Sequence, residues 1–148
     1  MEDSIQTVLS DVSRMLRRAF NERTREIGVT SPQWIVLNTL TMNEGTNQGG
    51  LADILGIEPI TLCRILDRLQ DAELIERRRD PADRRAWRLF ITAKAKDLLE
   101  DLHPVGEEIM ALALDGLSEA ERDQFRDLLT RMRQNLSRRA EAPGTNEP

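Results

Sequence analysis

Residues 51–92 read LADILGIEPITLCRILDRLQDAELIERRRDPADRRAWRLFIT, and this stretch decides the fold class. Its pattern predicts a short helix, a tight turn, a second helix, and then two strands joined by an arginine-rich loop. Asn47 is placed to cap the first helix, Gly56 suits its left-handed end, and Pro59 suits the first residue of the second helix. No other stretch carries a pattern of comparable specificity.

The two helices are predicted to be amphipathic. Leu51, Ile54 and Leu55 give the first an apolar stripe, and the second has a stripe of its own at Leu62, Leu66 and Leu69. The residues off the second stripe are expected to point outward: Ile60, Thr61, Arg64, Asp67 and Arg68. Such a face suits a helix lying in the DNA major groove, where an arginine can bind guanine O6 and N7. An ordinary solvated helix face would show the same pattern.

The predicted hairpin concentrates positive charge. Residues 77–88 contain six arginines and two aspartates, a net charge of +4, whereas the whole chain carries −5. An arginine at a loop tip fits a narrow minor groove, and Asp83 is expected to pair with a neighbouring arginine. Alternation places Trp87, Leu89 and Ile91 on one strand face. Solvation is the alternative for a charge run, but DNA contact is favoured because the run adjoins a candidate reading helix.

Helical patterns continue on both sides of this stretch. The predicted apolar face of the first helix ends at Phe20, and Trp34 and Ile35 are expected to point inward from the next helix. After the strands, Thr92 should cap a long helix that Pro104 kinks or interrupts. A capping box at residues 118–121 (SEAE) predicts the start of the last helix. Apolar stripes on the first and last helices need a partner outside a single chain.

Composition excludes several classes of protein. The chain has 148 residues, with 32% charged and 3% aromatic residues, which suits one domain of long helices with a partly shared core. No apolar run is long enough to cross a membrane and the N-terminus does not resemble a secretory signal, so a cytoplasmic location is expected. One cysteine excludes an internal disulfide. Together with a single histidine it offers neither a zinc site nor a nucleophile–base pair, so no cofactor and no enzymatic activity are expected.

The chain resembles the MarR family of winged helix-turn-helix regulators, and is closest to its SlyA-like branch. The resemblance covers about residues 11–138 and is carried by SPQWIVL (31–37), LADILGIEPITLCRILDRL (51–69) and LIERRRDPADRRAWRLFITAKA (74–95). It implies a mainly α fold with a small β-hairpin wing. It also implies one domain over residues 1–140, with the winged helix at about 31–92 and dimerisation helices at about 4–27 and 93–139. Residues 141–148 are predicted to be a disordered tail. The family commonly has glycine just before the wing, where this chain has Glu73, so a different helix end is expected.

The resemblance also implies a function. Its members are homodimers that bind double-stranded DNA with inverted-repeat symmetry, either as ligand-responsive repressors or as factors that relieve silencing. By position, the reading helix carries Pro59, Ile60, Thr61 and Arg64, with Arg68 on the same outward face, and the wing carries Asp83, Arg84 and Arg85. The runner-up interpretation is a helical protein-interaction module whose basic hairpin binds an acidic partner.

Family members often bind small aromatic carboxylates or phenolic compounds near the dimer helices. By position, Arg14, Arg17 and Trp34 are the candidates for such a pocket. The arginines would bind a carboxylate and Trp34 would supply a flat apolar wall. The alternative is that Trp34 belongs to the core and that both arginines are surface charges.

Overall fold

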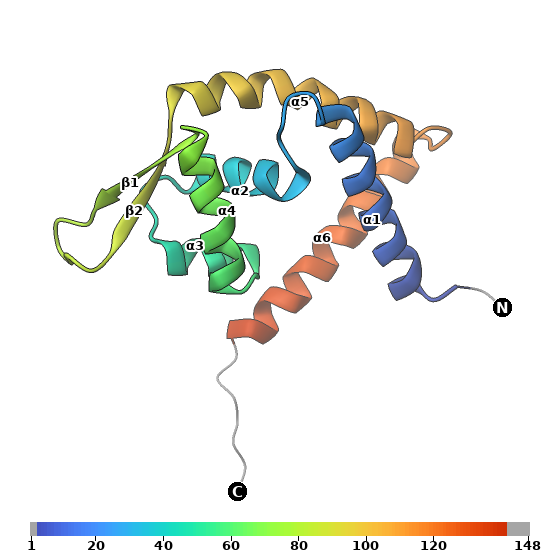
Figure 1. Cartoon of the computed structure of the whole chain (residues 1–148). Helices are drawn as coiled ribbons and strands as arrows, with labels where there is room; N and C mark the ends of the chain where they lie inside the picture. The colour runs from blue at the N-terminus through green and yellow to red at the C-terminus, as the bar shows by residue number, and fades with distance from the viewer. Residues whose placement is uncertain (1–2, 142–148) are drawn as a thin grey trace, which may run out of the picture. The chain divides into compact units, whose positions relative to one another are not determined.

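The computed structural model describes residues 3–141, with side chains as far as residue 138. This part of the chain is mainly α-helical with one small hairpin, as predicted (Figure 1). The elements are α1 (Ile5–Thr24), α2 (Ser31–Met42), α3 (Gln48–Leu55), α4 (Pro59–Asp71), β1 (Ile75–Arg79), β2 (Trp87–Ile91), α5 (Ala93–Ala113) and α6 (Glu119–Glu141). The chain forms two compact units, one ending at Met110 and the other starting at Ala111. The predicted tail lies outside the described residues except for Glu141, the last residue of α6.

The boundaries of α3 and α4 follow from local chemistry. The Asn47 side chain accepts a hydrogen bond of 2.7 Å from the backbone N–H of Gly50, which caps α3. Gly56 ends the helix in the left-handed conformation, with φ of 64°. Pro59 is the first residue of α4, where its missing N–H costs no hydrogen bond. All three predictions are confirmed, and the result is a helix-turn-helix.

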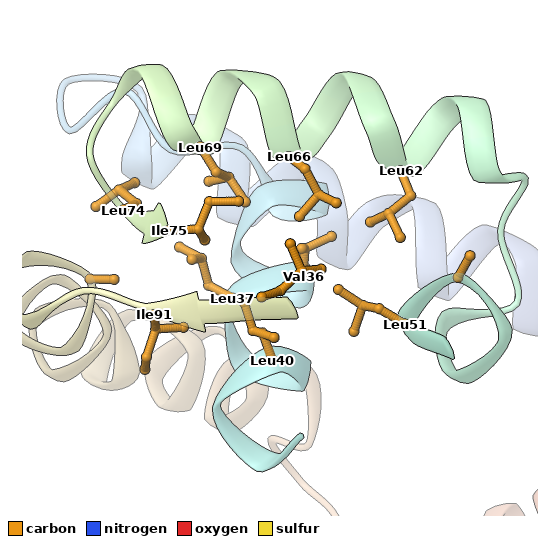
Figure 2. Close-up of a cluster of buried hydrophobic side chains, with 13 residues drawn as sticks. Val36, Leu37, Leu40, Leu51, Leu62, Leu66, Leu69, Leu74, Ile75 and Ile91 are labelled. Carbon is orange, nitrogen blue, oxygen red and sulfur yellow. The ribbon is translucent and has the colours of Figure 1, made fainter. Parts of the chain in front are cut away.

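The core of the winged helix lies beneath α4. Leu62, Leu66 and Leu69 are completely or almost completely buried. Figure 2 shows them pointing from α4 toward Leu37 of α2 and Leu51 of α3. Each buried leucine contributes about 1.5–3 kcal/mol of transfer free energy. This packing leaves the opposite face of α4 free.

Two apolar residues predicted to be buried are exposed. Ile54 on α3 is 54% exposed and Ile35 on α2 is also exposed. The buried apolar residues are Val36, Leu37 and Leu40 on α2, and Leu51 and Ala52 on α3. At about 100° per residue, Ile35 lies roughly 145° from the centre of the first set and Ile54 roughly 110° from the centre of the second, so both isoleucines lie off the buried faces. The spacing of apolar residues in the sequence does not show where the buried face of each helix is centred.

The root of the hairpin is fixed on the loop between α2 and α3. The strands are antiparallel, with Ile75 opposite Ile91 and Arg79 opposite Trp87. On the other edge of β2, the backbone of Leu89 exchanges hydrogen bonds with Gly45 and Thr46, at 2.8 and 2.9 Å. The tip has no such support, and Figure 1 shows it extending away from α2, α3 and α4.

Glu73 joins α4 to the hairpin in a left-handed conformation, with φ of 60°. It is the only residue other than glycine with positive φ in the described chain. Its carbonyl accepts a hydrogen bond of 2.7 Å from the Thr92 hydroxyl, which ties this turn to the start of α5. The glutamate therefore occupies the backbone conformation that glycine adopts most easily.

Replacing Glu73 by glycine is expected to stabilise the fold. A side chain in this conformation costs about 1–2 kcal/mol, part of which glycine returns through its larger unfolded-state entropy, so the expected net gain is about 0.5–1 kcal/mol. Urea denaturation would measure the difference. Glu73→Ala is the control because it removes the carboxylate but keeps the strain. If the alanine variant were as stable as the glycine variant, backbone strain would not be the cause.

The long helices begin as predicted. The Thr92 hydroxyl accepts a hydrogen bond of 3.2 Å from Ala95 N–H at the start of α5. Ser118 and Glu121 form the reciprocal capping box of α6. Pro104 does not interrupt α5, which is continuous from Ala93 to Ala113, because losing one N–H removes a single helical hydrogen bond.

Apolar side chains on α1 and on α6 are exposed in the single chain. On α1 they are Ile5, Val8, Leu9, Val12 and Met15, and on α6 they are Phe125, Leu128, Met132 and Leu136. The positions on α6 recur at helical spacing and form one stripe. Two long unpartnered stripes of this kind are typical of a surface that another chain covers.

Candidate nucleic-acid interface

The outward face of α4 presents the predicted reading residues to solvent. Ile60 is 66% exposed, and Thr61, Arg64 and Arg68 are exposed beside it. Pro59 starts the helix and is exposed as well. The structure therefore brings together all five α4 residues proposed for DNA contact.

The tip of the hairpin is ordered by two aspartates that accept backbone N–H groups. Asp80 accepts a hydrogen bond of 2.9 Å from Ala82, and Asp83 accepts one of 2.9 Å from Arg85. The expected ion pair between Asp83 and a neighbouring arginine is therefore wrong. A short carboxylate two residues before a free N–H closes a local turn more readily than it reaches a guanidinium group. Asp83 still shapes the tip, through the backbone.

Asp80 connects the tip to the strands. Its carboxylate also pairs with Arg88 of β2 at 3.2 Å. The pKa of Asp80 lies below its ordinary value, chiefly because the Ala82 N–H donates to the ionised form, with Arg88 adding to the effect. The turn is therefore held by the charged carboxylate.

Acid is expected to loosen this turn only below the usual pKa of an aspartate. Because the folded pKa is lowered, the stabilisation is complete above about pH 3.9 and disappears as the pH falls through the lowered value. An NMR titration of the Ala82 amide would measure the midpoint, with Asp80→Asn as the control that abolishes the transition. A midpoint at or above about 3.9 would contradict this assignment.

Trp87 does not belong to the core, although it shares a strand face with Leu89 and Ile91. It is 41% exposed, whereas Leu89 and Ile91 on the same strand are buried. Its partner in the ladder is Arg79, whose guanidinium carbon lies 4.7 Å from the centre of the Trp87 ring. The core reaches only as far toward the hairpin tip as Leu89, so the alternating apolar pattern of β2 extends beyond the buried part of the strand.

The arginines of this region fall into two groups. Arg77, Arg78, Arg79 and Arg88 interact with neighbouring side chains or aromatic rings. The guanidinium groups of Arg64, Arg68, Arg84 and Arg85 have no ion-pair partner among residues 3–138. Two of these free cations lie on α4 and two at the hairpin tip. The sequence does not separate the two groups, because the partners depend on strand pairing within the hairpin and, for Arg77, on how α4 lies against β1.

A concavity lies among α1, α2 and α5. It has a volume of about 250 Å³, and Arg17, Phe20, Trp34 and Gly106 are among its lining residues. The Trp34 ring stacks on Phe20 with centroids 4.6 Å apart. A Cβ at Gly106 would lie only 3.2 Å from the indole, so glycine lets α5 approach closely. The pocket is mostly apolar with one cation at its edge.

The structure brings Arg17 and Trp34 together but not Arg14. Arg17 contacts Ser13 at 3.0 Å and has no carboxylate partner in the described part of the chain. Arg14 pairs with Asp11 and lies outside this pocket. Positions three apart are neighbours on a helix surface, and the two head groups differ because Arg14 is held by Asp11 whereas Arg17 donates to Ser13.

Two other kinds of feature are absent from residues 3–141. No helix there is long and apolar enough to span a membrane. No group of three or more metal-binding side chains gathers in the same part of the chain.

Known proteins share this architecture. A model of the MarR family matches residues 27–86. The transcriptional regulator SlyA is 28% identical over 92% of this chain and 96% of its own, with a TM-score of 0.84. A MarR transcriptional regulator from Methanosarcina mazei Go1 is 28% identical over 90% and 96%, with a TM-score of 0.86. A mutant MarR from E. coli, solved in complex with operator DNA, shares the fold at 23% identity over 86% and 92%, with a TM-score of 0.79.

Proposed function

We propose that this chain, which matches a MarR family model over residues 27–86 and shares the fold of SlyA and of a MarR regulator, is a transcriptional regulator of that family and a homodimer that binds an inverted-repeat operator. The observation that carries the proposal is the placement of four free guanidinium groups on α4 and the hairpin tip of an otherwise acidic chain. Local charge at the contacting face, rather than net charge, sets affinity for DNA phosphates. In the E. coli MarR mutant, the same fold was solved with operator DNA. Acting on DNA, the protein would work in the cytoplasm.

Different residues are proposed to contact the major groove, the phosphates and the minor groove. The first turns of α4 enter the major groove, where Arg64 binds guanine O6 and N7, and where Ile60 and Thr61 meet thymine methyl groups or base edges. Arg68, one turn further along, binds a phosphate. The hairpin tip enters the flanking minor groove with Arg84 and Arg85, while Asp83 holds the turn that presents them.

The dimer explains the exposed stripes. The apolar faces of α1 and α6 are buried against a second copy of the chain, which removes them from water. A two-fold axis then places two α4 helices about 34 Å apart, one turn of DNA, so that the operator is a palindrome. Each dimer carries two hairpins, and binding therefore weakens steeply as salt rises.

The pocket lined by Arg17 and Trp34 is proposed as the site of a small aromatic carboxylate that releases the operator. A hydroxybenzoate should quench the fluorescence of Trp34 in a Trp87→Phe background, where no other tryptophan remains. Replacing Arg17 by methionine should weaken binding about 10- to 100-fold, the range expected for a charge-assisted hydrogen bond. Arg14→Met is the matched control, since Arg14 lies outside the pocket. Equal binding by all three proteins would remove Arg17 from the site.

Fluorescence anisotropy of DNA from upstream of the protein's own gene tests the function. The proposal predicts tight binding, no comparable binding to a scrambled duplex, and a steep loss of affinity with salt. Systematic selection of binding sequences would supply the operator if it lies elsewhere. A failure to bind any duplex at low salt would contradict the proposal and favour an acidic protein as the partner of the hairpin.

A further inference from the structure

Arg77 differs from the other arginines of the hairpin. Its side chain is only 18% exposed. One guanidinium nitrogen, Nη1, donates to Gln70 Oε1 at 2.6 Å, and the other, Nη2, donates to Asp67 Oδ1 at 2.8 Å. Both acceptors belong to α4 and lie three residues apart, so they share one face of the helix. The guanidinium is therefore fully engaged on the side facing α4.

This pair of hydrogen bonds from Arg77, here called the fork, connects the hairpin to α4, the two elements proposed to read DNA. Arg77 is the central residue of β1, opposite Leu89 in the ladder, and its partners lie in the second half of α4. Two parallel hydrogen bonds from a planar guanidinium group fix orientation as well as distance. The backbone of Leu89 already fixes β2 to the loop between α2 and α3, and Arg77 adds the side-chain contact that ties β1 to α4.

A small change of angle at Arg77 would move the hairpin tip by several ångströms. Pro81 lies four residues beyond Arg77, a distance of about 13 Å along an extended strand. A swing of about 20° at Arg77 would then displace the tip by about 4–5 Å, which exceeds the reach of a hydrogen bond. A two-stranded ribbon whose far end has no other support cannot correct such a swing.

We propose that Arg77 is a positioning residue that holds the hairpin at a set angle to α4, so that both elements meet adjacent grooves of DNA in one register. Arg77 does not contact the DNA itself. This assignment rests on the proposed function for its purpose, but its structural part holds for the free protein and can be tested there.

The first test uses no DNA. Nitroxide labels at Asp71→Cys on α4 and Ala82→Cys at the tip, in a Cys63→Ser background, report the distance between the two elements by pulsed electron paramagnetic resonance. Arg77→Met and Arg77→Lys should both broaden or shift the distance distribution, because lysine keeps the charge but lacks the fork. An unchanged distribution in Arg77→Met would overturn the proposal, whether or not the protein binds DNA.

The second test is a double-mutant cycle on the full-length chain with its operator duplex. Arg77→Met should weaken binding about tenfold, and Arg77→Lys should weaken it similarly. In the Arg84→Ala/Arg85→Ala background, Arg77→Met should cause little further loss of affinity. The tip then has no cations to contact DNA, so its position no longer affects binding. Full rescue by lysine, or losses that multiply, would show that Arg77 contacts DNA directly. Circular dichroism confirms that each variant is folded.

Discussion

Replacing Arg84 and Arg85 together by alanine is expected to weaken operator binding about 100- to 1000-fold. The two guanidinium groups have no ion-pair partner among the described residues, and their turn is held by backbone hydrogen bonds to Asp80 and Asp83. A dimer loses four cations, so the slope of log affinity against log salt should fall by about 3 to 4 units. Fluorescence anisotropy over a salt series measures both quantities.

The control must remove the same charge elsewhere. Arg18→Ala/Arg25→Ala does so at exposed positions on and just after α1, far along the sequence from the hairpin. It should change affinity by no more than about twofold to threefold if only local charge matters. If the two double variants lost affinity equally, the hairpin tip would not be a DNA contact.

Replacing Leu128 by aspartate is expected to dissociate the dimer. Leu128 lies in the exposed apolar stripe of α6, and a two-fold axis places each substitution twice in the interface. Losing two leucines and burying two carboxylates should weaken association at least about 1000-fold. Analytical ultracentrifugation distinguishes the protomer of 16.9 kDa from a species of twice that mass.

Loss of the dimer should also abolish tight operator binding, because one α4 reads only one half-site. Gln134→Asp is the control, since it adds the same charge to α6 at an exposed polar position. It should leave both mass and affinity unchanged. A Leu128→Asp variant that remained a dimer would place the interface elsewhere.

The features predicted correctly from sequence depend on neighbours along the chain. Asn47, Gly56 and Pro59 define the ends of two helices through contacts within a few residues, and each behaves as expected. The leucine stripe of α4 is periodic enough to predict which face is buried, and therefore which face carries Arg64. Local chemistry thus predicted most of the helix-turn-helix.

The features that sequence could not supply depend on tertiary packing. Ile54 is as apolar as Leu51, and only the position of α2 decides which of them is covered. Trp87 continues the strand pattern past the end of the core. The sequence alone does not distinguish the six arginines of the hairpin. In the structure, Arg77 lies close enough to α4 to form hydrogen bonds with it, whereas Arg84 and Arg85 have no ion-pair partner among the described residues.

Hydroxyl-radical footprinting of the operator complex tests the central claim most directly. The account predicts a pattern with two-fold symmetry and two protected regions centred about 10 base pairs apart. It also predicts a protected minor groove on each outer flank, lost selectively in the Arg84→Ala/Arg85→Ala variant. A single asymmetric footprint, or flanks that stay protected in that variant, would contradict the assignment of α4 and the hairpin as paired readers of DNA.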